Sequence, residues 1–416
     1  MRSSTRGAGS GATGERGRAA GALLVVGVAA ALLGTVVAPS SASSASSAEP
    51  EGASQLDGGH RGGRTPHPVD LGVPGETSDV VAVSDSGVVI GSYSDDGVHT
   101  RAFRWREGVI DVMPGLTSSR PEDVNDAGQV VINGRYGDEP LRPFLWQPDG
   151  TVVDLLGPGG VGNPGGINSR GDVALTVQVP GQDGQHYAAV WQDGVLHRLA
   201  PPEIAFSVVA DAPAINDRGE VTGIAMVGTT QTAFVWRDGA MHLMDTPDGG
   251  YTLGAAINER GQVYVGTPDG MVVWEPDGRV GPAVAEFGAM AFGDRGGAVG
   301  FVSPAPTFRP VPAVLDRRGV TLLPTLGGPD GQVYGTNGRG MHVGWSATAQ
   351  GELLPTAWVR GRAVALGGRL RGVGTASEGW ARDVDARGRA VGMLHFAPGG
   401  EDYVERAVLW ELGRHP

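Results

Sequence analysis

Aromatic and ionisable side chains occur in the segments of this chain that vary most in sequence. Eight of these residues stand out: Tyr93, Asp95, Tyr136, His186, Tyr187, Tyr251, Phe308 and Tyr403. Aromatic rings supply apolar contact area at small entropic cost, and carboxylates and hydroxyls orient a ligand by hydrogen bonding. This mixture suits the recognition of a sugar or a peptide, so we expect these eight residues to bind the ligand.

The same segments carry carboxylates that suggest a second function. Six acidic residues lie in or beside them: Asp95, Asp96, Asp138, Glu139, Glu401 and Asp402. Two carboxylates held across a glycosidic bond can act as acid and base, although solvated loop charges are far commoner. A hydrolase or lyase acting on a polysaccharide is therefore the first alternative to a binding protein. A purely structural repeat protein of the cell envelope is the second.

Other catalytic patterns are absent from the sequence. There is no cysteine, and the histidines do not fall in a paired metal-binding spacing. No GxSxG motif occurs, and the glycine-rich stretch from Gly157 lies between expected strands rather than before a helix. We therefore predict neither a metal nor a cofactor.

The elements that must position these loops come from an internal repeat. Its clearest copy is residues 214–223 (AINDRGEVTG) followed by residues 233–239 (AFVWRDG). The turn glycine recurs about 43 residues apart, a spacing that fits a four-stranded propeller blade. It falls at Gly87, Gly128, Gly171, Gly219, Gly261, Gly296, Gly340 and Gly388.

Each turn has a structural interpretation. In Asn216-Asp217-Arg218-Gly219, the Asn side chain caps backbone amides and glycine adopts the left-handed conformation that completes a hairpin. A calcium loop is the functional alternative, but each turn offers only one or two carboxylates. We expect the turn residues to be fully occupied in making their own hairpins, and changes of charge at Arg218 and Arg260 on this face to leave ligand binding unaffected.

The second part of the repeat places a large apolar residue at a fixed point in a strand. The position holds Trp105, Trp146, Trp191, Trp236, Trp274, Leu315, Trp358 and Trp410. A ring at the same place in every unit suits packing between twisted sheets, whereas sugar-stacking tryptophans would gather in a few loops. We therefore expect these residues in the core.

Together the two parts of the repeat resemble the HAF repeat of extracellular bacterial proteins, over about residues 80–410. The histidine that names that repeat is absent here, where its position holds Arg101, Arg142, Tyr187, Thr232 or Arg406. Any binding by that histidine in the family is therefore not implied for this chain.

The predicted fold is an all-β propeller of about eight four-stranded blades over residues 67–416, with seven blades as the alternative. Residues 68–72 (PVDLG) match a fourth strand, and the last unit lacks one after Trp410. An N-terminal strand that completes the final blade would close the ring and remove exposed sheet edges. The short turns would then share one face, and the variable connections would lie on the other.

The N-terminus and the charge predict location and partners. Four arginines, the apolar run from Ala19 to Val37 and small residues up to Ala48 are typical of a signal peptide over residues 1–48, with a flexible linker over 49–66. Export to the cell surface or medium is expected, with an uncleaved anchor as the one membrane alternative. The net charge is −13, and −16 beyond residue 48, because the first 48 residues hold four arginines and one glutamate. This disfavours nucleic acid and leaves an extracellular glycan or protein as partner of a monomer.

Overall fold

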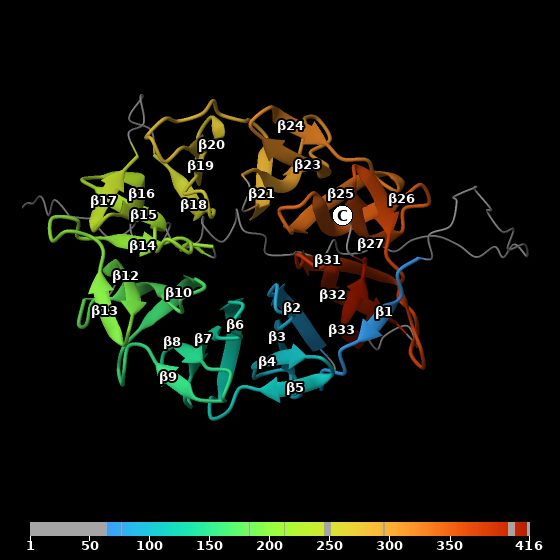
Figure 1. Ribbon diagram of the computed structural model, residues 1–416, viewed down its shortest axis with the longest axis horizontal. Helices are drawn as coiled ribbons and strands as arrows, with labels where there is room; N and C mark the ends of the chain where they lie inside the picture. Colours follow the sequence, from blue (N-terminus) through green and yellow to red (C-terminus); the bar gives the residue numbers. More distant parts are fainter. Residues whose placement is uncertain are drawn as a thin grey trace, which may run out of the picture. The chain divides into compact units, whose positions relative to one another are not determined.

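The computed structural model describes residues 65–75, 77–182, 184–211, 213–244, 251–293, 296–397 and 404–413. These residues form strands and turns without a helix, and the strands make a ring of small sheets (Figure 1). None of them belongs to a helix able to span a membrane. The expected signal peptide and nearly all of the expected linker lie outside the described residues.

In each sheet the strands follow one another along the chain, except that the sheet of the eighth blade also contains the N-terminal strand. The first blade has β2 (Thr77–Val83), β3 (Val89–Ser94), β4 (Arg101–Arg106) and β5 (Val109–Val112). The second has β6 (Ser118–Val124), β7 (Val130–Arg135), β8 (Arg142–Trp146) and β9 (Val152–Asp154). The third has β10 (Gly162–Ile167), β11 (Val173–Gln178), β12 (His186–Gln192) and β13 (Val195–Arg198). The fourth has β14 (Ser207–Val209), β15 (Val221–Val227), β16 (Thr230–Arg237) and β17 (Ala240–Leu243).

The second half of the ring repeats this order. The fifth blade has β18 (Leu253–Ile257), β19 (Val263–Thr267) and β20 (Gly270–Trp274). The sixth has β21 (Phe287–Phe292), β22 (Ala298–Val302), β23 (Val311–Asp316) and β24 (Gly319–Leu322). The seventh has β25 (Gly327–Thr336), β26 (Met341–Thr348), β27 (Leu353–Val359) and β28 (Arg362–Ala365). After a short ribbon of β29 (Arg369–Leu370) and β30 (Gly374–Thr375), the eighth has β31 (Glu378–Val384), β32 (Arg389–Phe396) and β33 (Val404–Glu411).

The ring is an eight-bladed β-propeller, which confirms the predicted fold and rules out seven blades. Seven sheets have four strands. The fifth has three, and isolated bridges from Met271 to Val284 and from Trp274 to Val280 hold the segment that runs along its outer edge.

The N-terminal strand closes the ring as predicted. Strand β1 (Pro68–Asp70) pairs with β33 and supplies the fourth strand of the eighth blade, with Val69 opposite Leu409. The adjoining Leu71 and Val73 are buried in a cluster that contains residues of both the first and the eighth blades. The two ends of the described chain therefore belong to one sheet.

The repeated turns have the predicted conformation. All eight turn glycines have positive φ, which ranges from 75° at Gly261 to 93° at Gly87. In the fourth blade, Asn216 Oδ1 accepts hydrogen bonds from the backbone amides of Arg218 and Glu220, both at 3.1 Å. The Asn side chain thus shapes the turn and glycine completes it.

The large apolar residues of the second part of the repeat pack in or against the core. Trp146, Trp274, Leu315, Trp358 and Trp410 are buried. The other three tryptophans, Trp105, Trp191 and Trp236, are partly buried and pack against core clusters. None of these eight side chains is an exposed ring of the kind that stacks on a sugar.

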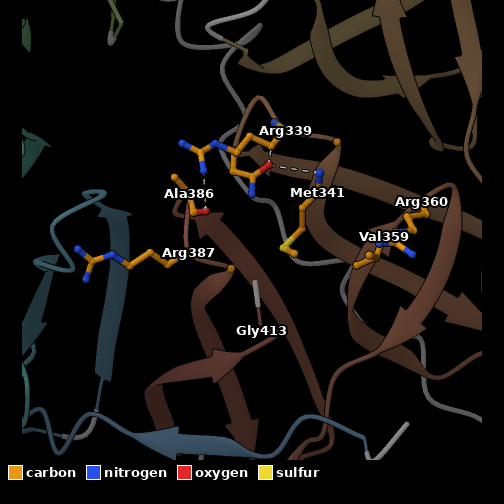
Figure 2. Close-up of a pocket in the computed structure, with 10 residues that line it drawn as sticks. Arg339, Met341, Val359, Arg360, Ala386, Arg387 and Gly413 are labelled. Carbon is orange, nitrogen blue, oxygen red and sulfur yellow. Dashed lines mark hydrogen bonds between the residues drawn. The ribbon is translucent and has the colours of Figure 1, made fainter. Parts of the chain in front are cut away.

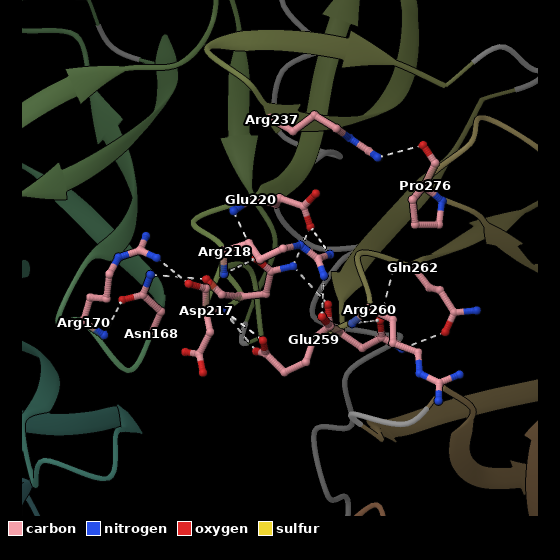
Figure 3. A network of polar contacts seen from close by, with 12 residues as sticks. Asn168, Arg170, Asp217, Arg218, Glu220, Arg237, Glu259, Arg260, Gln262 and Pro276 are labelled. Carbon is pink, nitrogen blue, oxygen red and sulfur yellow. Dashed lines mark hydrogen bonds and ion pairs between the residues drawn. The ribbon is translucent and has the colours of Figure 1, made fainter.

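The turn side chains also join neighbouring blades, so the prediction that they serve only their own hairpins is wrong. Asn168 Nδ2 donates to the carbonyl of Asn216 at 3.2 Å, and Asn216 Nδ2 donates to that of Asn258 at 3.1 Å (Figure 3). The Arg218 guanidinium donates to the carbonyl of Glu259 at 2.8 Å and to Glu220 Oε2 at 2.6 Å. One turn therefore binds the next along this part of the ring.

Candidate functional site

The ligand-binding residues predicted from the sequence share one face of the ring but not one site. Within each blade the strands are antiparallel, so the short turns lie at one end and the variable connections at the other. The predicted residues come from five blades: Tyr93 and Asp95 from the first, Tyr136 from the second, His186 and Tyr187 from the third, Tyr251 beside the fifth and Phe308 from the sixth. Tyr403 lies outside the described residues.

Some of these side chains are held by arginine or by a neighbouring ring. Tyr136 is 41% exposed and lies edge-on to Phe144, with ring centroids 5.6 Å apart. The guanidinium carbon of Arg198 lies 4.9 Å from the ring centroid of Tyr187. His186 is partly buried against Phe206, 5.8 Å away between centroids. These rings are pre-ordered, which favours recognition by lowering the entropy lost on binding.

The remaining predicted ligand-binding residues differ in how far their side chains are exposed. Tyr93 is buried, with its side chain in the core between the first and eighth blades, so a ligand on the loops would not reach its ring. Asp95 faces Arg101 at 3.6 Å with both side chains about half exposed. Tyr251 and Phe308 are exposed and lie in separate connections.

The loop carboxylates proposed as acid and base are engaged locally. The Asp96 carboxylate accepts hydrogen bonds from the backbone amide of His99, from the His99 ring nitrogen at 2.7 Å and from the backbone amide of Val98. Together these bonds hold the pKa of Asp96 well below the usual range. Glu139 pairs with Arg142 at 2.6 Å. No contact within the described residues brings two of these carboxylates together, and Glu401 and Asp402 lie outside them.

A different cluster lies in the eighth blade, on the face of the variable connections. Glu378, His395 and Glu405 occupy directly opposed positions on β31, β32 and β33. Opposed residues of neighbouring strands project from the same side of a sheet, so the three side chains form one row. His395 Nδ1 lies 3.7 Å from Glu378 Oε1, and His395 Nε2 lies 3.7 Å from Glu405 Oε1.

An indole and the first blade complete this cluster. The Trp380 ring lies against the His395 imidazole, with centroids 4.6 Å apart and an interplanar angle of 52°. Trp380 also packs against the apolar cluster that joins the first and eighth blades. His395 is 8% exposed, whereas the side chains of Glu378 and Glu405 are 30% and 28% exposed. The carboxylates are therefore accessible while the imidazole supports them.

The electrostatics of the cluster follow from its burial. Desolvation raises the pKa of Glu405, and the negative charge of Asp79 on β2 acts in the same direction. The charge of His395 and a hydrogen bond from the backbone amide of Ser78 favour the ionised form but do not outweigh the burial. The site thus collects three carboxylates, of Asp79, Glu378 and Glu405, around an imidazole and an indole.

This arrangement can accept hydrogen bonds and attract positive charge. Carboxylate oxygens accept hydrogen bonds from hydroxyl and amino groups, and the part of the Trp380 indole that stays exposed adds an aromatic surface beside them. The described residues contain no group of three or more side chains suited to hold a metal ion, and this cluster is no exception.

Glu378, His395 and Glu405 are not among the site residues predicted from the sequence. A signal existed, since the strand pattern places each residue near the end of its strand away from the short turn. Finding the row requires the register across three strands, and β32 and β33 are joined by a connection whose length sets that register. The cluster therefore becomes visible only when the pairing is known.

Comparisons with known proteins show no family. No family model matches this chain, and no curated protein matches it. Among solved structures, a puromycin hydrolase is 17% identical, with a TM-score of 0.48 over 82% of this chain and 60% of that one. This chain therefore spans less than two thirds of that protein.

Two shorter proteins also match. A gluconolactonase from Xanthomonas campestris is 20% identical, with a TM-score of 0.29 over 52% of this chain and 83% of that one. A virginiamycin B lyase from Staphylococcus aureus is 13% identical, with a TM-score of 0.40 over 69% of this chain and 94% of that one. At such identities and TM-scores these likenesses carry no information about activity.

Proposed function

We propose that this protein is an extracellular binding propeller without catalytic activity, which recognises a glycan, a peptide or another cell-surface partner on the face of the variable connections. The observation that carries the proposal is the row of Glu378, His395 and Glu405 beside Trp380. It combines hydrogen-bond acceptors with an aromatic surface on a rigid sheet. The ligand it suits bears hydroxyl or amino groups, as glycans with amino sugars and basic peptides do.

Resemblance to the HAF repeat and the character of residues 1–48 support an exported protein. The turns at Asn216 and Asn258 keep the motif on which that resemblance rests, and both have a structural role in the ring. Membership of that repeat family and location outside the cell are part of the proposal.

The first test is a ligand screen of the purified chain with glycans, cell-wall fragments and basic peptides, followed by variants of the row. Glu405→Gln should weaken binding of the best ligand about tenfold, the effect of one lost hydrogen bond to a charged group. Trp380→Ala should weaken binding by a similar factor, because it removes the aromatic contact. Asp138→Asn is the matched control, because Asp138 is an exposed carboxylate on the same face. Calorimetric titration gives the affinities.

The outcome also separates two places on this face. If Tyr136→Ala and Tyr187→Ala weaken binding while Glu405→Gln does not, the ligand occupies the outer connections and the row is not its site. Unchanged affinity in Trp380→Ala, Glu405→Gln, Tyr136→Ala and Tyr187→Ala would contradict the assignment of ligand binding to this face.

An enzyme is the second candidate function, favoured by one observation. The pKa of Glu405 is raised by burial, and a carboxyl that keeps its proton nearer neutral pH can serve as a general acid beside a second carboxylate, here Glu378. Turnover of a polysaccharide ligand that disappears in both Glu405→Gln and Glu378→Gln would favour a hydrolase or lyase over a binding protein.

A further inference from the structure

A cavity of about 150 Å³ lies between the seventh and eighth blades, on the face of the short turns (Figure 2). Its lining comes from the turns that follow β25, β27 and β31 and from Gly413 after β33. The side chains are mainly cationic or apolar: Asn337, Arg339, Met341, Val359, Arg360 and Arg387. No carboxylate lines it, in a chain whose net charge is −13.

The cavity has no acidic residue at a turn position that is acidic in two other blades. In the third and fourth blades the turn arginine pairs with a carboxylate two residues further on, Arg170 with Asp172 at 2.5 Å and Arg218 with Glu220 at 2.6 Å. In the seventh blade the same place holds Met341, which is buried. Arg339 therefore lacks the intrablade carboxylate that Arg170 and Arg218 have.

The eighth blade adds a second turn arginine that has no acidic residue two positions further on. Arg387 has the turn position of Arg339, and two residues beyond it stands Arg389 rather than an acid. The Asp385 carboxylate of this turn pairs with Arg389 at 2.5 Å. The Asp85 carboxylate, which reaches this turn from the first blade, accepts the backbone amide of Ala386 at 2.6 Å. The carboxylates that contact the turn are thus already engaged.

The donors at the cavity remain available to a ligand. Arg339 makes one long hydrogen bond, from Nη1 to the carbonyl of Ala386 at 3.4 Å. Arg360 and Arg387 form no side-chain hydrogen bond or ion pair within the described residues, and Arg387 extends away from Met341 in Figure 2. Arg339, Arg360 and Arg387 thus line the cavity, and most of their N–H donors are unsatisfied by protein within the described residues.

We propose that this cavity binds a tetrahedral oxyanion, a phosphate or a sulfate, either free or as the end group of a larger molecule. Guanidinium groups bind such oxygens through paired, charge-assisted hydrogen bonds. A cavity near 150 Å³ can hold a benzene-sized molecule in another protein, so one oxyanion with part of its carrier fits. Apolar contact with Met341 and Val359 would be made by that carrier.

The proposal is tested by titrating the full chain with inorganic phosphate, sulfate, glucose 6-phosphate and glucose at low ionic strength, with calorimetry and thermal melting as readouts. Phosphate or glucose 6-phosphate should bind and raise the melting temperature, and glucose should do neither. Binding by inorganic phosphate as tight as by glucose 6-phosphate indicates a free anion. Binding by glucose 6-phosphate alone indicates an end group.

Variants locate the site. Arg339→Gln and Arg387→Gln should each weaken binding about tenfold. Arg260→Gln should leave it unchanged, because Arg260 holds the same turn position in the fifth blade but does not line the cavity. Met341→Glu introduces the carboxylate that the third and fourth blades have at this position, so it should abolish binding by pairing with Arg339.

Two results would overturn the proposal. One is the absence of any saturable binding of phosphate, sulfate or glucose 6-phosphate by the folded chain. The other is equal weakening by Arg260→Gln and Arg387→Gln, which would indicate attraction to surface charge rather than to this cavity. Since Arg387 is exposed, its variant is expected to fold even if Met341→Glu does not.

Discussion

Glu122 carries a charge that the fold tolerates poorly. It is the extra residue of the bulge in β6, beside Asp123 and near Asp211. Burial is the main cause that raises its pKa to about 7, and the two neighbouring carboxylates act in the same direction against the opposing charge of Arg120. Glu122 is therefore partly protonated in the folded protein at neutral pH.

The stability of the ring should depend on pH through this residue. A carboxyl whose folded pKa exceeds its unfolded value binds its proton more tightly in the folded state. The folded state therefore loses stability as pH rises from about 4.5 to about 7. Glu122→Gln should raise the free energy of unfolding at pH 8 by about 1–2 kcal/mol, discounted for partial solvent exposure, and have little effect at pH 4.

Denaturant unfolding at the two pH values provides the measurement. Asp138→Asn is the control, because it removes an exposed carboxylate of the same blade and should change stability little at either pH. An equal effect of Glu122→Gln at pH 4 and pH 8 would show that its charge is not the cause.

The element that recurs most faithfully is the turn between the first two strands of a blade, and its side chains act on two blades at once. Arg218 and Arg260 hold the same position in successive turns. Arg218 bonds to the carbonyl of Glu259 in the next blade and to Glu220 in its own. Arg260 forms no side-chain hydrogen bond within the described residues, and its guanidinium extends away from the network in Figure 3.

The two arginines should therefore respond differently to charge reversal. Arg218→Glu removes both bonds and places a third carboxylate beside Glu220 and Glu259, so we expect a loss of about 1–2 kcal/mol in the free energy of unfolding. Arg260→Glu should cost less than about 0.5 kcal/mol. Urea unfolding of the two variants compares them directly, and equal losses would refute a role for Arg218 between blades.

At the scale of the whole molecule, closure depends on a strand of three residues. Strand β1 pairs with β33, and the adjoining Leu71 and Val73 are buried at the junction of the first and eighth blades. Deletion through Gly72 removes the Leu71 side chain and leaves Val73, and burial of one leucine stabilises a fold by about 1.5–3 kcal/mol. Removing the strand also exposes the edge of β33 to pairing with another molecule.

Deletion through Gly72 should therefore lower the melting temperature by several degrees and promote aggregation. The matched control is deletion through Arg64, which leaves β1 and the hydrogen bond from the Gly367 amide to the Pro66 carbonyl in place. Thermal melting with light scattering checks both. If the two truncated chains melt alike, the strand does not close the ring.

Much of this ring could be predicted because its rules are local. A turn such as Asn216 to Gly219 is specified by an Asn that caps nearby amides and a glycine that adopts positive φ, and both effects act within five residues. The eightfold recurrence of that turn sets the number of blades. The strand pattern at Pro68 and its absence after Trp410 predict the closure, since an unpaired edge is unfavourable in any ring.

Only the tertiary structure decided where functional groups meet. Tyr93 belongs to a variable segment yet is buried, because packing between the first and eighth blades determines its exposure. Glu378, His395 and Glu405 form a row through strand register, and the cavity beside Arg339 forms where two turns of the seventh blade adjoin one of the eighth. Local sequence chemistry specifies turns and strands, whereas the distance between side chains 10 or more residues apart is set by long-range pairing and packing, which no single segment encodes.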